Sequence, residues 1–138
     1  MSQFPRLLNS LILKDFQPLS TWSEENRILT PDTSAFPGRW SNEVTPYLIE
    51  PMDAFTDDNI TDIVIQASSQ VAKTELEINS LLYMIDRDPV SCLWVLPSDD
   101  LCKDFSQLRL MPAIRACDIT KKRLDEIAID KKEQKRKC

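Results

Sequence analysis

A lysine followed by a threonine, Lys73-Thr74, stands between a stretch of small residues and an amphipathic segment. This order of residue types is typical of a phosphate-binding loop, in which backbone N–H groups and the N-terminus of a helix face the phosphates. In such a loop the lysine contacts the β- and γ-phosphate oxygens, and the hydroxyl contacts Mg²⁺. The full pattern, G-x-x-x-x-G-K-[ST], is not met, because alanine occupies both glycine positions, Ala67 and Ala72.

The two alanines weaken this interpretation without removing it. The anion is held by amide donors, by the charge of Lys73 and by the helix dipole, and glycine supplies none of these. Glycine supplies backbone freedom, so alanine at position 72 costs about 1 kcal/mol if the loop needs a positive φ there. The alternative is an ordinary strand, polar turn and helix, with Lys73 as a solvated charge on the first helical turn.

The runs on either side of the loop predict a βαβ unit. Residues 60–65 are rich in β-branched side chains, residues 74–85 have apolar side chains at helical spacing, and residues 92–96 are a second apolar run. Strands joined in this way are parallel, and ligands bind at their carboxyl ends. Lys73 would lie at such an end, where a phosphate-binding loop is found.

Other patterns predict helices before this unit. An apolar repeat predicts a helix from about residue 4 to Lys14. The capping box of Thr21 and Glu24 predicts another over residues 22–28. A third is expected over residues 46–55, although Pro51 should delay or kink it.

One more helix is predicted after the second apolar run. It should extend over residues 98–110, with Leu101, Phe105 and Leu108 facing inward. Met111-Pro112 is expected to end it, because proline lacks the N–H that a helix interior needs.

Composition limits the possible classes of function. The 138 residues and 42% hydrophobic content fit one domain or a piece of a larger one. Four cysteines without a C-x-x-C pair, together with the absence of histidine, argue against a zinc site and against Ser-His or Cys-His catalysis. Cys92 and Cys102 are expected to be small core residues in a reducing compartment. The chain has no membrane-length apolar run and no signal-peptide profile, so we expect a soluble intracellular protein.

The net charge of −5 is unevenly distributed. Residues 1–120 carry 9 basic and 18 acidic groups, whereas residues 121–138 carry 8 basic and 4 acidic groups. The acidic body argues against broad nucleic-acid binding. The basic tail could contact phosphate, or it could be solvated and frayed.

Several short blocks occur in an order and spacing that point to one family. They are Trp22-Ser23-Glu24-Glu25-Asn26-Arg27 (W-x-E-x-x-R), Pro37-Gly38-Arg39-Trp40 (P-G-x-W), Pro46-Tyr47 with Glu50-Pro51-Met52-Asp53-Ala54 (P-Y and E-P-M-D-A), Ser69-Gln70-Val71-Ala72-Lys73-Thr74-Glu75 (S-x-Q-x-G-K-T-E), and the segment from Leu96 to Arg115. Over about residues 20 to 116 the chain thus resembles the N-terminal ATPase domain of the large terminase subunit of tailed bacteriophages, of the lambda GpA type.

The resemblance implies an α/β fold. Its architecture would be a P-loop NTPase-like three-layer fold with an incomplete parallel sheet and a helical N-terminal extension. We expect residues 1–45 to form that helical and loop extension, residues 46–116 a partial P-loop ATPase core, and residues 117–138 a charged C-terminal tail.

The resemblance also implies ATP and Mg²⁺ as cofactors and assigns roles to residues. Lys73 would contact the β/γ-phosphate and Thr74 would hold Mg²⁺. Tyr47 would lie near the adenine, although it could equally be a core aromatic residue. The loop would line the phosphates with Ser68, Ser69, Gln70, Val71 and Ala72.

The catalytic acid of such an ATPase is not evident in this sequence. ATP hydrolysis needs a second acidic site after an apolar strand, but the late pair Asp125-Glu126 follows the basic run 121–123. The family pattern is also lost from about Ile119. We therefore expect a truncated or frame-altered copy, such as a prophage remnant, that binds ATP weakly and does not hydrolyse it alone.

The implied setting is the host cytoplasm. In the full-length protein the partners would be the small terminase subunit, the capsid portal and viral DNA. Two alternatives remain open: a non-enzymatic interaction module that uses residues 1–14 and the basic tail, and a helicase-like nucleic-acid ATPase.

Overall fold

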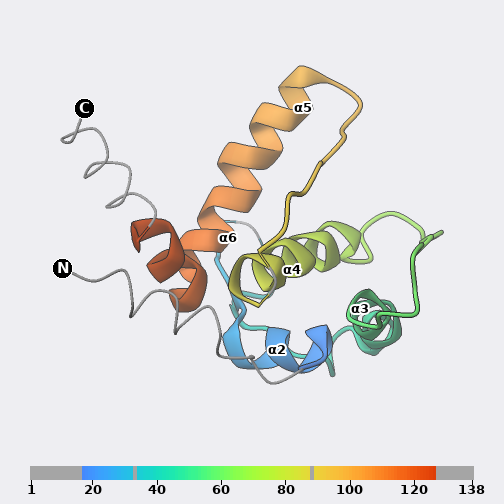
Figure 1. Ribbon diagram of the computed structural model, residues 1–138. Coiled ribbons are helices and arrows are strands. Elements are labelled where there is room, and N and C mark those ends of the chain that lie inside the picture. Colours follow the sequence, from blue (N-terminus) through green and yellow to red (C-terminus); the bar gives the residue numbers. More distant parts are fainter. Residues whose placement is uncertain (1–16, 33, 88, 127–138) are drawn as a thin grey trace.

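A long helix, α4 (Lys73–Asp86), organises the described part of the chain (Figure 1). The computed structural model describes residues 17–32, 34–87 and 89–126. The other elements are α2 (Leu19–Asn26), β1 (Ile28–Leu29), β2 (Gly38–Arg39), the 3₁₀ helix η1 (Pro46–Leu48), α3 (Ile49–Phe55), α5 (Asp99–Asp104), the π-helical stretch η2 (Phe105–Leu110) and α6 (Met111–Ala116). Residues 118–126 are also helical.

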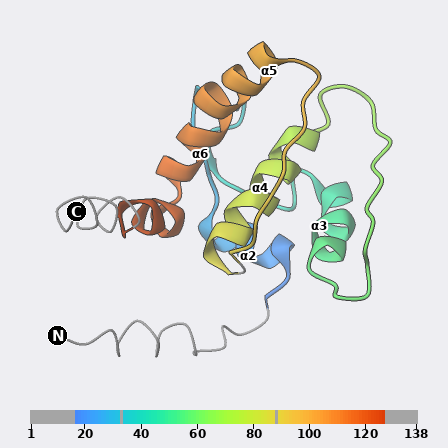
Figure 2. The same cartoon turned by 45° about the horizontal axis from the view of Figure 1, so that its top comes forward.

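Helices α2 and α3 pack against α4 and against each other, and Figure 2 shows the three together. The Trp22 ring is fully buried and meets the Tyr83 ring edge-on, with the ring centroids 5.7 Å apart. The Trp22 indole N–H also donates to the Asp86 carboxylate over 3.0 Å. This buried bond fixes α2 to the C-terminal turn of α4, because an unpaired indole N–H or carboxylate would be costly there. The fully buried apolar side chains around it include Leu19, Met52 and Leu82.

Helix α2 starts earlier than the capping box predicts. It begins at Leu19, after Pro18, and no side chain of its own caps it. A carboxylate oxygen of Asp53, on α3, instead accepts from the Ser20 N–H over 3.1 Å. Glu24 is used elsewhere, since its carboxylate accepts from the Asn42 N–H over 3.0 Å. The burial of Leu19 and the cap from α3 therefore override the local pattern.

The sheet differs most from the prediction. Strands β1 and β2 pair antiparallel, with Ile28 opposite Arg39 and Leu29 opposite Gly38, and they form the one sheet of the described residues. The predicted strands 60–65 and 92–96 are extended chain without strand pairing. The expectation of a parallel βαβ sheet is therefore wrong for this structure.

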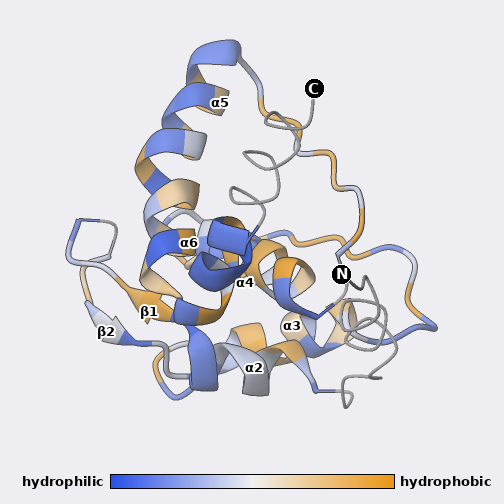
Figure 3. Ribbon diagram, turned by 60° about the vertical axis from the view of Figure 1, so that its left-hand side comes forward, coloured by the Kyte–Doolittle hydropathy of each residue, from blue (hydrophilic) through white to orange (hydrophobic). Residues whose placement is uncertain are grey.

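The physical reason is the lack of a partner strand for either apolar run. Val64, Leu93 and Val95 are 93%, 87% and 79% exposed. Figure 3 shows hydrophobic colour along these coil segments. A β-branched run favours extended backbone, but a strand also needs a neighbour to pair its N–H and C=O groups. Within the described chain neither run has that neighbour.

The last predicted helix begins as expected but continues further. The Ser98 hydroxyl caps α5 by accepting from the Leu101 N–H over 3.3 Å. The helix then passes through η2 into α6, so Met111-Pro112 does not end it. A proline ring clashes with the carbonyl four residues earlier in a regular α-helix, and the wider π-helical turn ahead of Pro112 accommodates it.

The side chains of this helix are also less buried than predicted. Leu101 and Leu108 are 51% and 62% exposed, so neither faces a core. Phe105 packs against the core as expected and stacks on Trp94, with the ring centroids 4.7 Å apart. Cys92 is exposed as well, contrary to prediction. The two leucines are exposed because the α5 end of this helix projects away from α4 (Figure 1). Cys92 is exposed because the segment 92–96 that contains it has no partner strand within the described chain.

Two predicted features lie partly outside the described residues. The expected N-terminal helix falls on residues 1–16, which the structure does not describe. The predicted charged tail begins with a helix over residues 118–126, in which Thr120 is fully buried. The Thr120 hydroxyl donates to the Ile114 carbonyl over 2.8 Å, which ties this helix to α6. Residues 127–138 lie outside the described part.

A buried guanidinium connects the loop after α2 to α4. Arg27 is 1% exposed, and it donates through Nε to the Asn79 side chain over 2.9 Å and through Nη2 to the Glu75 carboxylate over 2.8 Å. A third bond goes to the Ile28 carbonyl. Burial lowers the pKa of Arg27, although the neighbouring Glu75 charge acts against this. The guanidinium therefore stays charged and paired.

Replacing Arg27 with methionine should destabilise the protein by about 3 kcal/mol or more, because the buried Glu75 carboxylate would lose its main partner. Urea denaturation of the variant would measure the change in the free energy of unfolding. The double variant Arg27→Met/Glu75→Met should recover most of the loss, and the exposed-site control Arg39→Met should change stability little. A single variant as stable as the wild type would contradict this role for Arg27.

Candidate functional site

The candidate site is the loop of residues 67–72 and the first turn of α4. Lys73 is the first residue of α4, as the sequence predicts. Its ammonium donates to the Ala67 carbonyl over 3.3 Å and also to the Ser68 carbonyl. The loop therefore folds back over its own lysine. These contacts position Lys73 in this structure, because the described residues directly before the loop, 60–66, are not part of a paired strand.

The loop backbone takes the conformation that glycine favours. Ala72, the N-cap of α4, has φ 56° and ψ 25°, and Gln70 has φ 59°. These two are the non-glycine residues with positive φ in the described chain. A side chain in this left-handed region costs roughly 1 to 2 kcal/mol. Position 72 therefore has the positive φ at which alanine was expected to destabilise the loop.

The first turn of α4 presents its N–H groups without a side-chain cap. Ala72 has no side chain that could accept from them, whereas Ser98 does so for α5. The helix has 14 residues, so its dipole adds partial positive charge at this end. Uncapped amides, a lysine and the Thr74 hydroxyl form a donor set that fits an anion.

The acidic groups next to the loop are either paired with arginine or attract the Lys73 ammonium. Glu75, in the first turn, is buried between Arg27 and Arg109, whose guanidinium lies 3.5 Å from its second carboxylate oxygen. Glu77 is exposed as a residue, but its carboxyl is partly shielded from water, which raises its pKa, and the Lys73 charge lowers it. Thus one carboxylate next to the loop is neutralised, while Glu77 lies one turn from Lys73 and competes for it.

The structure places the other predicted site residues as follows. Ser68, Ser69 and Gln70 are exposed, and residues 71–74 are half-buried. Tyr47 is 56% exposed on η1, so it is not a core aromatic residue. Its proposed position near an adenine remains a prediction.

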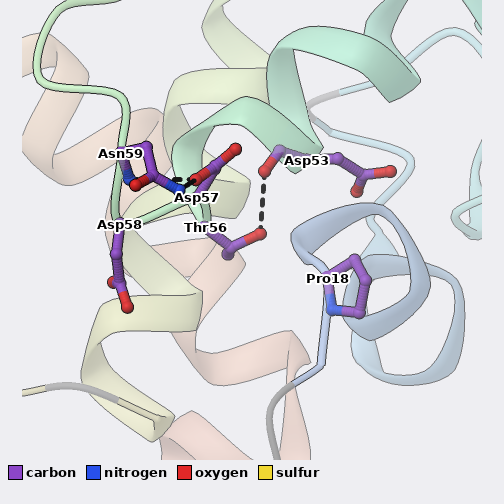
Figure 4. A pocket seen from close by; sticks show the side chains of 6 residues that line it. All are labelled: Pro18, Asp53, Thr56, Asp57, Asp58 and Asn59. Atoms are coloured by element: carbon purple, nitrogen blue, oxygen red, sulfur yellow. Dashed lines mark hydrogen bonds between the residues drawn. The ribbon is translucent and has the colours of Figure 1, made fainter.

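A hollow of about 390 Å³ lies away from this loop, between the start of α2 and the end of α3 (Figure 4). It is lined by Pro18, Asp53, Thr56, Asp57, Asp58 and Asn59. The Asn59 backbone N–H, and secondarily its side-chain amide, donates to the Asp57 carboxylate and lowers its pKa. The hollow is lined by the carboxylates of Asp53, Asp57 and Asp58, which would repel phosphate. This hollow is therefore not a nucleotide site.

Sequence reasoning missed the residues that hold the site in place. Arg27 and Asn79 fix the first two turns of α4, and Trp22 with Asp86 fixes its last turn. Arg27 and Trp22 fall in a recognised block, but nothing in the sequence indicates their partners. Among the described residues, no group of three or more His, Cys, Asp or Glu side chains is arranged to hold a metal ion.

A family model matches most of this chain. The model for the ATPase domain of the phage terminase large subunit gpA matches residues 34–137. The match includes the loop and α4, starts after the Trp22–Arg27 block and continues beyond residue 116. The expectation that the family pattern is lost from about Ile119 is therefore wrong. No curated protein and no solved structure matches the chain.

Substituting Ala72→Gly should raise the free energy of unfolding by up to about 1 kcal/mol, because glycine has no Cβ to strain the left-handed conformation. Chemical denaturation would measure it. Ala67→Gly is the matched control, and it should lower stability slightly, because Ala67 has no positive φ and glycine gains freedom in the unfolded chain. Equal effects at both positions would contradict the strain at Ala72.

Proposed function

Because this chain belongs to the ATPase-domain family of the phage terminase large subunit gpA, we propose that it binds ATP weakly through residues 67–74 and does not hydrolyse it alone. The observation that carries the proposal is the position of Lys73, at the start of a 14-residue helix with its ammonium held by the loop carbonyls. The uncapped first turn supports the same conclusion, since an anion can satisfy its amides.

Each residue of the proposed site would have its own role in binding Mg²⁺-ATP. The Lys73 ammonium would exchange its loop carbonyls for phosphate oxygens, and the Thr74 hydroxyl would hold Mg²⁺. Backbone N–H groups would line the phosphates at Ser68, Ser69, Gln70, Val71 and Ala72. Mg²⁺ commonly binds through phosphates, water and one or two protein oxygens, so a single hydroxyl fits this role. Tyr47 is exposed and would contact the adenine.

Weak binding follows from two features of the loop. Ala72 pays for its left-handed backbone in the folded protein. Lys73 must also give up two carbonyl partners, while Glu77 competes for its charge. The competition for Lys73 opposes phosphate binding directly. The strain at Ala72 is already present in the ligand-free loop, so it lowers the stability of the loop conformation proposed to bind phosphate.

The proposed lack of hydrolysis follows from the surroundings of the carboxylates that could serve as catalytic acid. Hydrolysis of ATP needs a residue that orients the attacking water, usually beside a second metal-supporting acid. Glu75 is engaged by Arg27 and Arg109. The late pair Asp125-Glu126 is exposed on a helix, where Glu126 lies 3.7 Å from Arg123. Neither arrangement supports a catalytic acid.

The family membership also supports a setting for this activity. The chain would act in packaging of viral DNA in the host cytoplasm, with the small terminase subunit and the capsid portal as partners of the full-length protein. Within the described residues, every helix is too short or too polar to cross a membrane.

A non-enzymatic interaction module is the second candidate function. It is favoured by the exposed apolar side chains of the extended segments, including Val64, Leu93 and Val95. Unpaired extended segments of this kind can add a strand from a partner protein. Under this alternative, nucleotide would have no effect on the protein.

Lys73→Ala should weaken Mg²⁺-ATP binding by at least about tenfold, because a charge-assisted contact to phosphate is lost. Isothermal titration calorimetry would measure this, and thermal unfolding with and without Mg²⁺-ATP would confirm it. Lys103→Ala is the control, since Lys103 is exposed on α5 and 3.6 Å from Asp100. It should bind as the wild type does. Equal ATP binding by all three proteins, or none by the wild type, would refute the proposed site.

A further inference from the structure

The side chain of Arg109 connects η2 to the first turn of α4. Its guanidinium lies 3.5 Å from the Oε1 atom of Glu75. That atom is buried and makes no hydrogen bond within the described residues, so the Arg109 charge compensates it. Glu75 is three residues after Ala72, about 4.5 Å along the helix axis. Arg109 therefore acts on the turn whose N–H groups are proposed to bind phosphate.

A second guanidinium is more positive charge than Glu75 requires. Arg27 already donates to the other oxygen, Oε2, over 2.8 Å. Burial is the main cause that lowers the pKa of Arg27, and the Arg109 charge acts in the same direction, so the two guanidinium groups repel each other. With one carboxylate between them, they leave one positive charge in excess beside the N-terminus of α4. Such an excess favours an anion at that end of the helix.

The orientation of η2 is the reverse of what burial alone would select. Leu108 is 62% exposed, whereas its neighbour Arg109 reaches the buried Glu75 carboxylate. The stretch is nevertheless held in place, because Phe105 and Leu110 pack against the core. A π-helical turn contains more residues than an α-helical one, so it changes the direction of the side chains that follow, and such turns are frequent at functional sites. In this helix the turn directs Arg109, and not Leu108, toward α4.

We propose that Arg109 is a positioning residue of the loop over residues 67–74. It holds the first turn of α4 through Glu75 and adds positive charge where the phosphates would bind. The inference rests on the proposed function, because it concerns the same loop. Arg109 acts on the phosphates through the α4 amides and through its charge, since its guanidinium is engaged by Glu75.

Arg109→Gln should weaken Mg²⁺-ATP binding at least about fivefold, as measured by isothermal titration calorimetry on the full chain. Arg109→Lys keeps the charge without the fork of donors and should recover most of the loss. Arg115→Gln is the matched control, because it removes the same charge from an exposed position on α6. It should change binding less than about twofold, since an exposed charge is screened by salt.

Ile114→Val is the control for stability. Ile114 is buried on α6, and the substitution removes one carbon from the core while leaving every charge in place. It should leave ATP binding unchanged. If Arg109 served stability alone, binding would weaken in both variants to the extent that each is destabilised.

Hydrogen exchange tests the same role without nucleotide. The Leu76 N–H closes the first turn of α4 by donating to the Ala72 carbonyl over 3.1 Å. In Arg109→Gln the amides of residues 76–79 should exchange several-fold faster, because local opening of this turn is easier. The amides of residues 83–86 should not change, since the bond from Trp22 to Asp86 still holds that end.

Unchanged exchange of residues 76–79 would overturn the proposal. So would unchanged ATP affinity in Arg109→Gln when Lys73→Ala loses binding, a result that leaves the proposed function standing. Equal weakening by Arg109→Gln and Arg115→Gln would reduce the effect to net charge and would overturn it as well. If the wild type binds no ATP, the proposed function fails, and the exchange measurement alone decides whether Arg109 holds this turn.

Discussion

The placement of α4 depends on one buried charged group, the Arg27 guanidinium. It joins Glu75 and Asn79, which lie one turn apart on α4, to the chain at the end of α2. A buried guanidinium is tolerated only when its donors are paired. Few other arrangements of α2 and α4 would keep these donors paired. At the other end of α4 the bond from Trp22 to Asp86 has the same effect. Helix α4 is thus fixed near both ends, by Trp22 on α2 and by Arg27 directly after α2.

This anchoring explains how the loop proposed to bind phosphate keeps its place although no parallel sheet lies beneath it in the described chain. In the described chain the loop is held by the fixed first turn of α4 and by the bonds from Lys73 to its own carbonyls. The loop also keeps a left-handed residue at position 72 although alanine stands there. The strain is carried by the rest of the fold, since an unsupported alanine would relax to a negative φ. The proposed nucleotide site rests on this loop geometry together with the family membership.

The described chain also leaves apolar surface uncovered. The extended segments expose Val64, Leu93 and Val95, and a hollow of about 400 Å³ beside the C-terminal half of α4 is lined largely by apolar side chains. Burying such surface is the main favourable term in folding and association, at about 25 cal/mol per Å². The two features differ in what they offer, because the hollow is a concave apolar surface whereas the extended segments offer backbone groups to a strand. They therefore call for different occupants.

The sequence by itself determined the approximate positions of α2, α3, α4 and α5 and the family of the chain. The apolar repeat predicted α4 almost to its ends, Ser98 predicted the start of α5, and the Lys-Thr pair placed Lys73 at a helix N-terminus. Tertiary structure decided the rest: that Asp53 caps α2, that Arg27 meets Glu75 and that two apolar runs remain unpaired. Periodicity and capping depend on residues within a few positions of one another, so a pattern can reveal them. The Arg27 contacts join residues 48 and 52 positions apart, and such partners are selected only when the packed chain buries both groups.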